Sequence, residues 1–193
     1  SAALLCAKVG DTTSEFAMQG TDAHSLCEHK LKKSFGQKSK DPTEDLQYFD
    51  EEMADCSDMY AQYVMEQLTA AKEKCKDPIV LIEQHLDFSK WVPQGFGTGD
   101  CVIVADETLQ VIDFKYGVGI LVDAEKNPQM MCYALGALQL FEGIYDIDSV
   151  SMTIFQPRRD NVSTYTISKA ELLKWADEVL APTAQLAAKG EGE

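Results

Sequence analysis

Three residues near the middle of the chain have the types and the spacing needed to hydrolyse a phosphate ester. Asp100 precedes an apolar run, and Asp113 and Lys115 close a second run that follows a short polar turn. Carboxylate oxygens bind hard divalent cations such as Mg²⁺, which polarise phosphoryl oxygens and lower the pKa of an attacking water. A lysine beside them supplies a compact positive charge that positions or activates the water. These residues therefore point to metal-assisted cleavage of a phosphodiester.

The two apolar runs predict antiparallel strands that would bring the three residues together. Antiparallel pairing places the start of one strand beside the end of the next, so Asp100 should lie next to Asp113. Side chains alternate along a strand, so Asp113 and Lys115 should share one face, with Phe114 turned into apolar packing. Because the motif is short, a plain ion pair between Asp113 and Lys115, with Asp100 as a turn residue, stays open as an alternative.

A sheet covered by helices is needed to hold these residues in place. Apolar, β-branched runs predict strands at residues 79–88, 101–104, 109–114, 150–155 and 163–167. Helical spacing and capping residues predict helices over 20–35, 41 to about 76, 127 to about 142, and about 168–188. Glycines and a proline at 93–99 predict a flexible loop. This order predicts an α/β (α+β) fold whose central mixed sheet carries helices on both faces.

Length and composition are those of one globular domain over residues 1–193, with a core of about 20–167 and a final helix. The sequence is 45% hydrophobic and 25% charged, which excludes disorder as its overall state. Apolar runs fall short of the roughly 18 residues that a spanning helix needs, and the first residues lack a basic leader. We expect a cytoplasmic protein of bacterial or phage origin. The missing initiator Met and the polar tail at 189–193 favour a fragment of a longer protein.

The formal net charge of −15 is unusual for a protein that binds nucleic acid, because phosphate binding relies on Lys and Arg. Charge is unevenly distributed along the chain, however. Five lysines fall within residues 30–40, and residues 41–58 are densely acidic. The lysine cluster is either a local binding surface or an ordinary solvated helix end.

Six cysteines are scattered along the chain without a C-x-x-C pair: Cys6, Cys27, Cys56, Cys75, Cys101 and Cys132. Such spacing does not suggest a disulfide framework, and a ligand or redox role stays open as the alternative to inert cysteines. We expect free thiols that behave as small apolar residues.

Several motifs, in their order across residues 20–140, resemble the RecB-like exonuclease branch of the PD-(D/E)XK nuclease superfamily. They are G-T-D-A-H ending at His24, Glu83 in a predicted strand, G-D ending at Asp100, V-I-D-F-K-Y-G around Asp113, and Q-M-M-C-Y ending at Tyr133. That branch includes nuclease domains of bacterial recombination complexes, CRISPR-associated exonucleases and phage-type exonucleases. A phage and prophage exonuclease group is the best match. The resemblance implies a restriction-endonuclease-like core.

The resemblance also implies roles for the matching residues. Mg²⁺ or Mn²⁺ would be bound by three side chains and one backbone carbonyl, those of His24, Asp100, Asp113 and Phe114, respectively. Lys115 would be the catalytic lysine, acting with Asp100 and Asp113. Glu83 matches an upstream acid that helps to hold a second metal or orients water.

Other residues near the expected site have two interpretations. Gln129 and Tyr133, one helical turn apart, match an element that supports the site or contacts the scissile strand, and they are also consistent with plain helix packing. Outside its motif, His24 would more often be a satisfied or exposed histidine than a ligand. Three aromatic residues are candidates either for the core or for stacking on bases: Trp91, Phe96 and Tyr116.

Taken together, the resemblance implies a metal-dependent deoxyribonuclease, most simply an exonuclease, that acts on DNA ends or single strands in recombination, replication or repair. A helicase or recombination protein would be its partner, and no membrane association is expected. Many relatives carry an iron–sulfur cluster, but only Cys6 matches a ligand, so we expect none in this chain. The alternative is a non-cleaving nuclease-fold module that binds DNA or protein. The complete set of Asp100, Asp113 and Lys115 favours the enzyme.

Overall fold

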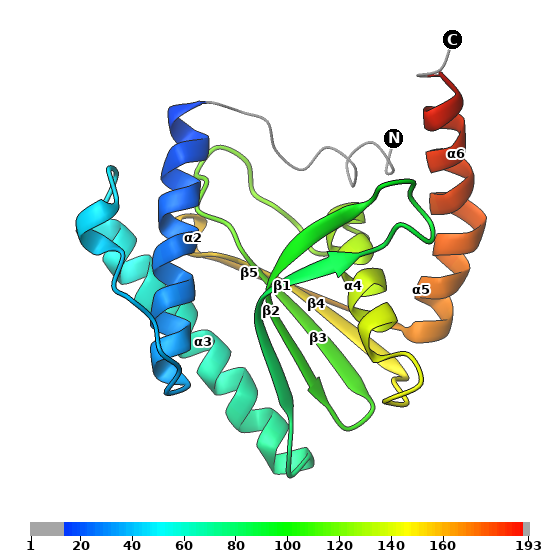
Figure 1. Ribbon diagram of the computed structural model, residues 1–193, viewed down its shortest axis with the longest axis horizontal. Helices are drawn as coiled ribbons and strands as arrows, with labels where there is room; N and C mark the ends of the chain where they lie inside the picture. The colour runs from blue at the N-terminus through cyan, green and yellow to red at the C-terminus, as the bar shows by residue number, and fades with distance from the viewer. Residues whose placement is uncertain (1–13, 191–193) are drawn as a thin grey trace.

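The computed structural model describes residues 14–190, and a five-stranded mixed sheet lies at its centre (Figure 1). The strands follow one another across the sheet in sequence order: β1 (Ile79–Asp87), β2 (Phe96–Ala105), β3 (Thr108–Phe114), β4 (Ser149–Gln156) and β5 (Asn161–Ser168). Neighbouring strands are antiparallel except β3 and β4, which are parallel. A parallel pair needs a long crossover, and α4 (Pro128–Phe141) provides it. The predicted order of helices and strands along the chain is confirmed.

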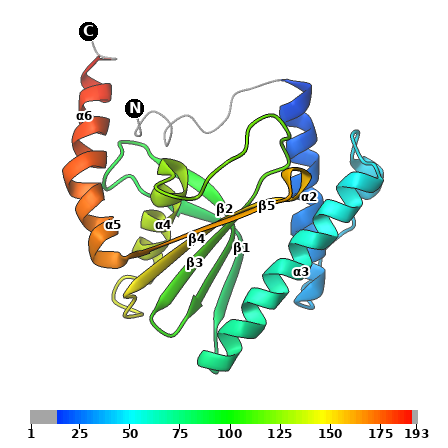
Figure 2. The same cartoon turned by 180° about the vertical axis from the view of Figure 1, so that it is seen from behind.

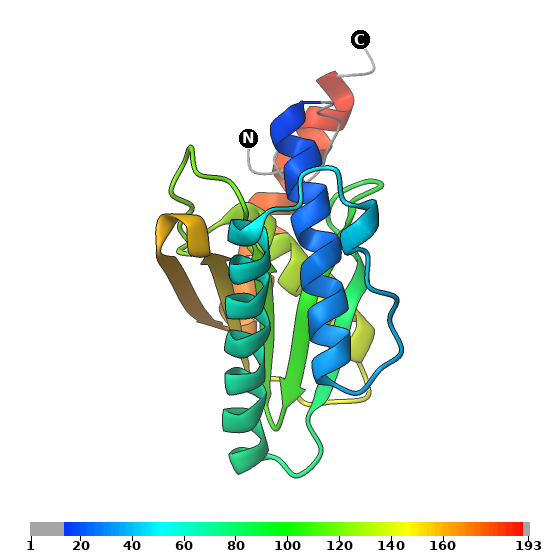
Figure 3. The same ribbon diagram turned by 90° about the vertical axis from the view of Figure 1, so that its left-hand side faces the viewer.

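Helices cover both faces of this sheet, as Figures 1 and 2 show from opposite sides. On one face lie α2 (Glu15–Ser34) and α3 (Glu51–Lys74), which run side by side in front of the strands in Figure 3. The other face carries α4 together with α5 (Lys169–Trp175), a π-helical turn (Ala176–Leu180) and α6 (Ala181–Gly190). The expected α/β architecture, with helices on both faces of a mixed sheet, is confirmed.

Alternating side chains of the central strands build two separate apolar cores. Ile103 and Ile112 pack toward α2 and α3, whereas Val102 and Val111 pack toward α4. Phe114 is fully buried on the α2 side, as the alternation predicts, and its ring contacts those of His24 and Tyr60 edge-on. Burial of a side chain of this size stabilises a fold by about 1.5–3 kcal/mol. The end of β3 is thereby held firmly beneath α2.

The first described helix begins earlier than the sequence indicated. Its N-cap is Ser14, whose hydroxyl accepts a hydrogen bond from a first-turn N–H, so the predicted start of this helix at residue 20 is wrong and neither Thr21 nor Asp22 caps it. Asp22 instead accepts a hydrogen bond of 2.9 Å from the backbone N–H of Tyr48. His24 consequently lies in the middle of a long helix, where its backbone is fixed on both sides.

The second predicted helix is also interrupted near its start. Residues Thr43–Asp45 form a separate 3-10 turn, in which the Asp41 carboxylate accepts a hydrogen bond of 2.9 Å from the Thr43 N–H. Asp50 caps α3 by accepting from the Met53 N–H at 2.8 Å. Each aspartate therefore starts its own helical segment, and the chain bends between the two.

The glycine-rich segment before Asp100 was expected to be a flexible loop, and this is wrong for its second half. Gly97 and Gly99 lie within β2, and Asp100 is in the middle of the strand, not at its start. A Cβ at Gly97 would collide with the Tyr133 ring, and one at Gly99 would come within 2.8 Å of Leu86. Close packing explains both glycines, because α4 and β1 approach the backbone of β2 too closely for a side chain.

Four cysteines, Cys27, Cys56, Cys75 and Cys101, are free thiols, and all but Cys75 are buried. Cys132 in α4 is disulfide-bonded, so the expectation of a free thiol is wrong at that position. Cys6, which was weighed as an iron–sulfur ligand, lies outside the described residues. Over residues 14–190, no helix has the length and apolar character required to cross a membrane.

Candidate metal centre

One cavity of about 770 Å³ collects nearly all the predicted site residues. It opens between α2, the β1–β2 hairpin, the end of β3 and the first turns of α4. Seven of the predicted side chains line it: His24, Glu83, Asp100, Asp113, Lys115, Gln129 and Tyr133. Phe114 packs behind the cavity wall, as its buried ring requires. Residues as far apart in the sequence as His24 and Tyr133 thus face a common space.

The two strands that carry Glu83 and Asp100 are irregular at these residues. Ile82 pairs with Cys101 and Gln84 pairs with Gly99, so Glu83 and Asp100 stand opposite each other outside the regular ladder. Glu83 has a positive φ of 50°, which an L-residue adopts at a cost of about 1–3 kcal/mol.

This break changes which face the following residues occupy. Before it, Ile82 packs toward α2 and α3 and Leu81 packs toward α4. After it, Leu86 packs toward α4, although unbroken alternation along the strand would put it on the same face as Ile82. The register of the two strands is the same on both sides of Glu83, so no extra residue is inserted as in a β-bulge, and the shift of alternation comes from the irregular backbone at Glu83. The strained backbone therefore aims the carboxylate of Glu83 into the cavity.

Three groups lie close enough to share one cation. The nearest ligand atoms of His24, Glu83 and Asp100 are all within 4.8 Å of one another. His24 Nδ1 is 3.0 Å from Asp100 Oδ1, and Asp100 Oδ2 accepts a 2.7 Å hydrogen bond from the Phe114 N–H. Asp100 is buried, so this backbone donor fixes the orientation of its carboxylate. The prediction that Asp100 lies beside the end of β3 is confirmed.

A second chain of polar contacts begins at Asp113. Lys115 Nζ is 2.9 Å from Asp113 Oδ2 and donates a 2.9 Å hydrogen bond to Gln129 Oε1. Gln129 Nε2 in turn donates to the Tyr133 hydroxyl at 3.2 Å. The Lys115 contact lacks hydrogen-bond geometry at Asp113 Oδ2, which is a buried acceptor without a hydrogen bond in the described part of the chain. The ammonium group of Lys115 offsets part of the desolvation cost of this buried carboxylate.

The site holds more negative charge than its own residues neutralise. Burial, then the neighbouring charge of Asp100, raises the pKa of Glu83 to about 8. For His24, burial lowers the pKa, but the carboxylates of Asp100, Asp113 and Glu83 outweigh it and raise the pKa to about 9. Burial also raises the pKa of Asp113, although Lys115 opposes this. A proton on His24 therefore provides the positive charge that a divalent cation would otherwise supply.

The donor set suits a divalent cation held by His24, Glu83 and Asp100. Carboxylate oxygens are the usual ligands of Mg²⁺ and Mn²⁺, and the imidazole nitrogen favours the transition metal of the two. Asp113 was predicted as a ligand but lies outside this compact group, since its Oδ2 faces Lys115. The backbone N–H of Phe114 donates to Asp100, and metal binding by the Phe114 carbonyl stays a prediction.

One acidic residue of the cavity was missed by sequence reasoning. Glu28 lines the same wall as His24, and its charge contributes to the raised pKa of Glu83. The two residues are four positions apart in α2, a spacing that puts them on one helical face. This spacing could have identified Glu28 from the sequence, because His24 was already a candidate metal ligand.

The three aromatic residues near the site differ in exposure. Trp91 and Tyr116 are buried, with 4% and 6% of their surface exposed, so they belong to the core. Phe96 is 60% exposed and lines the cavity. Trp91 and Tyr116 are therefore core residues, and Phe96 remains a candidate for stacking on bases.

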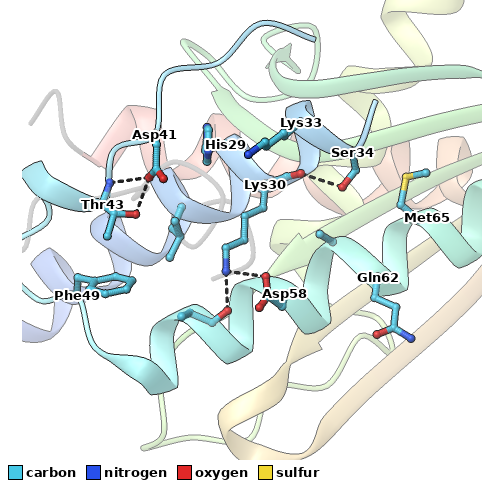
Figure 4. A pocket seen from close by; sticks show the side chains of 13 residues that line it. His29, Lys30, Lys33, Ser34, Asp41, Thr43, Phe49, Asp58, Gln62 and Met65 are labelled. Carbon is cyan, nitrogen blue, oxygen red and sulfur yellow. Dashed lines mark hydrogen bonds and ion pairs between the residues drawn. The ribbon is translucent and has the colours of Figure 1, made fainter. Parts of the chain in front are cut away.

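A second cavity, of about 610 Å³, lies between α2, α3 and the segment that joins them (Figure 4). Lys30 Nζ donates a 2.7 Å hydrogen bond to the Ala54 carbonyl and is 2.7 Å from Asp58 Oδ1. His29 Nδ1 is 2.8 Å from Ser39 Oγ. These polar groups are paired with their neighbours, which favours a structural role for this part of the lysine cluster.

A family model described as "Protein of unknown function (DUF2800)" matches residues 1–193, the full length of the chain. Among solved structures, the chain is similar to one titled "Crystal structure of SSO0001", with 13% identity and a TM-score of 0.27. The match covers 83% of this chain and 86% of that one. At that TM-score the likeness supports no conclusion about fold or function.

Proposed function

This chain belongs to the DUF2800 family, and we propose that it is a divalent-metal-dependent nuclease of the PD-(D/E)XK class, RecB-like branch. The observation that carries the proposal is the convergence of Lys115 with the carboxylates of Asp100, Asp113 and Glu83 in one cavity. An ion pair at a strand end would need only Asp113 and Lys115. Such a pair does not account for the carboxylate of Glu83, the histidine or the strained backbone at Glu83.

The proposed reaction is hydrolysis of a phosphodiester. Water attacks phosphorus, one P–O ester bond breaks, and the products are a phosphate monoester and an alcohol. A divalent cation held by His24, Glu83 and Asp100 would polarise the phosphoryl group and lower the pKa of the attacking water.

Lys115 would act as a fixed positive charge in this reaction. Burial lowers the pKa of its ammonium group, but Asp113 outweighs burial and raises it, so the group stays protonated at neutral pH. A protonated lysine cannot take the proton from water. It can hold the water by a hydrogen bond and stabilise the negative charge that develops on the phosphoryl oxygens.

Gln129 would be a positioning residue in this mechanism. Its side-chain carbonyl accepts from Lys115 Nζ, and its amide donates to Tyr133, which is buried in α4. This chain of contacts limits the positions that the ammonium group can occupy. Correct placement of a catalytic group within a fraction of an ångström is a large part of its effect.

DNA is the proposed substrate, cut from an end or as a single strand, in recombination, replication or repair. The net charge of −15 supports a need for low salt, or for a helicase or recombination protein that delivers the substrate. The cleavage class and substrate come from the motif resemblance, while the metal chemistry comes from the donor set.

A time course on end-labelled linear DNA and on closed circular DNA tests the proposal. Wild type, Asp113→Ala and Lys115→Ala are compared at low salt with Mn²⁺, Mg²⁺ or EDTA. We expect metal-dependent loss of linear DNA by the wild type only, and no cutting of circles. Cleavage of circles would make the protein an endonuclease. Equal cleavage by wild type and Lys115→Ala would overturn the mechanism, and no cleavage under any condition would favour a non-cleaving binding module.

A further inference from the structure

Phe96 differs from the other aromatic residues of its segment. Phe88 and Trp91, in the connection between β1 and β2, are buried, whereas 60% of Phe96 is exposed. A single exposed phenylalanine is ordinary on a protein surface. Phe96, however, lines the cavity that contains Asp100 and Lys115, so its ring is exposed toward the proposed reaction site.

The backbone that carries Phe96 is fixed by its neighbours. Its residue pairs with Asp87 at the end of the β1–β2 ladder, and its ring lies 5.4 Å from that of His85, at an interplanar angle of 32°. The neighbouring connection is anchored because the Trp91 indole N–H donates a 3.2 Å hydrogen bond to Asp177. Gly95 fits against the Phe88 ring, where a Cβ would approach to 2.7 Å. An exposed ring on a fixed strand backbone loses less freedom when it meets a ligand than a ring on a flexible loop.

The charges around Phe96 limit how a nucleic acid could bind here. Among the charged residues that line the cavity, the four acids Glu28, Glu83, Asp100 and Asp113 outnumber the two basic groups of His24 and Lys115. Phosphate contacts alone would therefore give weak binding. Stacking of a base on an aromatic ring depends little on net charge and strengthens binding by about 5-fold to 100-fold for each base.

We propose that Phe96 is the platform on which an unpaired base next to the scissile phosphate stacks. This inference rests on the proposed function and narrows its substrate to nucleic acid that is single-stranded, or opened, at the site of cleavage. A base inside a duplex is stacked between its neighbours and offers no free face to Phe96. A planar aromatic residue at position 96 is required, while the identity of the base is not, since every base has a π-face.

Binding of matched oligonucleotides tests this directly. Fluorescence anisotropy with Mn²⁺ is measured in a Lys115→Met background, which removes cleavage under the proposed mechanism and is the same in every arm. The two probes are a single-stranded oligonucleotide and the same oligonucleotide with abasic sites throughout. The variants at the platform are Phe96→Ala, Phe96→Leu and Phe96→Trp. Phe49→Ala, a partly exposed phenylalanine in the second cavity, is the matched control.

We expect the background protein to bind the normal oligonucleotide about 5-fold to 100-fold more tightly than the abasic one. Phe96→Ala and Phe96→Leu should lose this preference, whereas Phe96→Trp and Phe49→Ala should keep it. An unchanged preference in Phe96→Ala, or no preference in the background protein, would overturn the proposal. Circular dichroism of each variant checks the fold.

The outcome is separable from that of the proposed nuclease activity. Cleavage by the wild type together with an unchanged preference in Phe96→Ala would leave the nuclease and remove the stacking platform. A preference that depends on Phe96, without cleavage by the wild type, would leave the platform in a binding protein.

Discussion

The two cavities that flank α2 have similar volumes but differ in how their charged groups are arranged. In the cavity between α2 and α3, several polar side chains are paired with close neighbours, as Lys30 is with Ala54 and Asp58. In the other, Glu83, Asp100 and Asp113 crowd together, and two of the three carboxyl groups have raised pKa values. Both cavities contain lysine and carboxylate groups, so composition does not separate them.

The difference shows how a candidate site is distinguished from an ordinary surface hollow. Polar groups that are already paired with one another add stability and offer no free donor or acceptor to a ligand. Groups held close despite repulsion, on a backbone strained at Glu83, are stable only because the surrounding fold forces them together. The cavity between α2 and α3 therefore provides matched control residues for the candidate metal centre.

The largest expected effect is on catalysis. Lys115→Met should lower the rate of DNA cleavage by about 10²–10³-fold, since the fixed charge acts in the transition state. Lys30→Met, which removes the corresponding charge from the second cavity, should leave the rate within about twofold of the wild type, because it makes no contact with the reacting groups. Single-turnover cleavage of labelled DNA measures both. A comparable loss of cleavage rate in the two variants would show that the rate depends on positive charge near α2 in general and not on Lys115 in the candidate metal centre.

The second largest effect is expected on metal binding, which should depend on the candidate metal centre and not on the second cavity. Asp100→Asn should weaken Mn²⁺ binding by at least about tenfold, because even residues outside the ligand shell contribute that much to metal affinity. Asp58→Asn, at the wall of the second cavity, should leave the affinity unchanged. Isothermal titration calorimetry gives both values. Equal affinities in wild type and Asp100→Asn would place the cation elsewhere.

The pH dependence of Mn²⁺ affinity offers a sharper comparison. In the metal-free protein the pKa is about 8 for Glu83 and about 9 for His24, so both groups carry protons at pH 7 that a cation must displace. Affinity should therefore rise with pH between 6 and 8, by about tenfold per unit for each proton released. In the second cavity, hydrogen bonds from Thr43 lower the pKa of Asp41, so that carboxylate is ionised throughout this range.

Calorimetry in buffers of different ionisation enthalpy counts the protons released. His24→Gln should release fewer protons than the wild type and show a shallower pH dependence. A proton count near zero at pH 7 in the wild type would contradict the raised pKa values of His24 and Glu83.

The smallest expected effect is on stability. Lys30→Met should lower the free energy of unfolding by about 0.5–1.5 kcal/mol, because it removes a hydrogen bond to the Ala54 carbonyl and an ion pair with the exposed Asp58. Urea denaturation measures the change, and Phe49→Ala serves as a second variant in the same cavity. No loss of stability in Lys30→Met would argue that the pairing in this cavity has no structural value.

The sequence predicted the site best where spacing along one element controls geometry. Asp113 and Lys115 are two apart in a strand, and they do contact each other. Gln129 and Tyr133 are four apart in a helix, and they too are hydrogen-bonded. The turn at Asp106, where φ is 57°, closes the hairpin that brings Asp100 next to β3, as the D-E-T segment indicated. Local periodicity was sufficient in these cases.

Prediction failed where a residue depends on what packs against it. Gly97 and Gly99 resemble loop residues, but they lie in β2 because Tyr133 and Leu86 occupy the space above them. Thr21 and Asp22 are good capping residues in the interior of a helix that Ser14 had already started. Propensity is a weak guide in such positions, since contacts from distant segments override it.

By itself, the sequence determined the order of helices and strands, the hairpin that joins Asp100 to Asp113, and the residue types that suggest metal-assisted hydrolysis. Only the tertiary structure decided that Glu83 lies with His24 and Asp100 in one group of potential ligands, that Asp113 lies outside that group, and that Phe96 is the exposed ring. The physical reason is that spacing fixes contacts within an element or a hairpin. Contacts between α2, the break in β1 and β2, and α4 depend on how the helices pack on the two faces of the sheet.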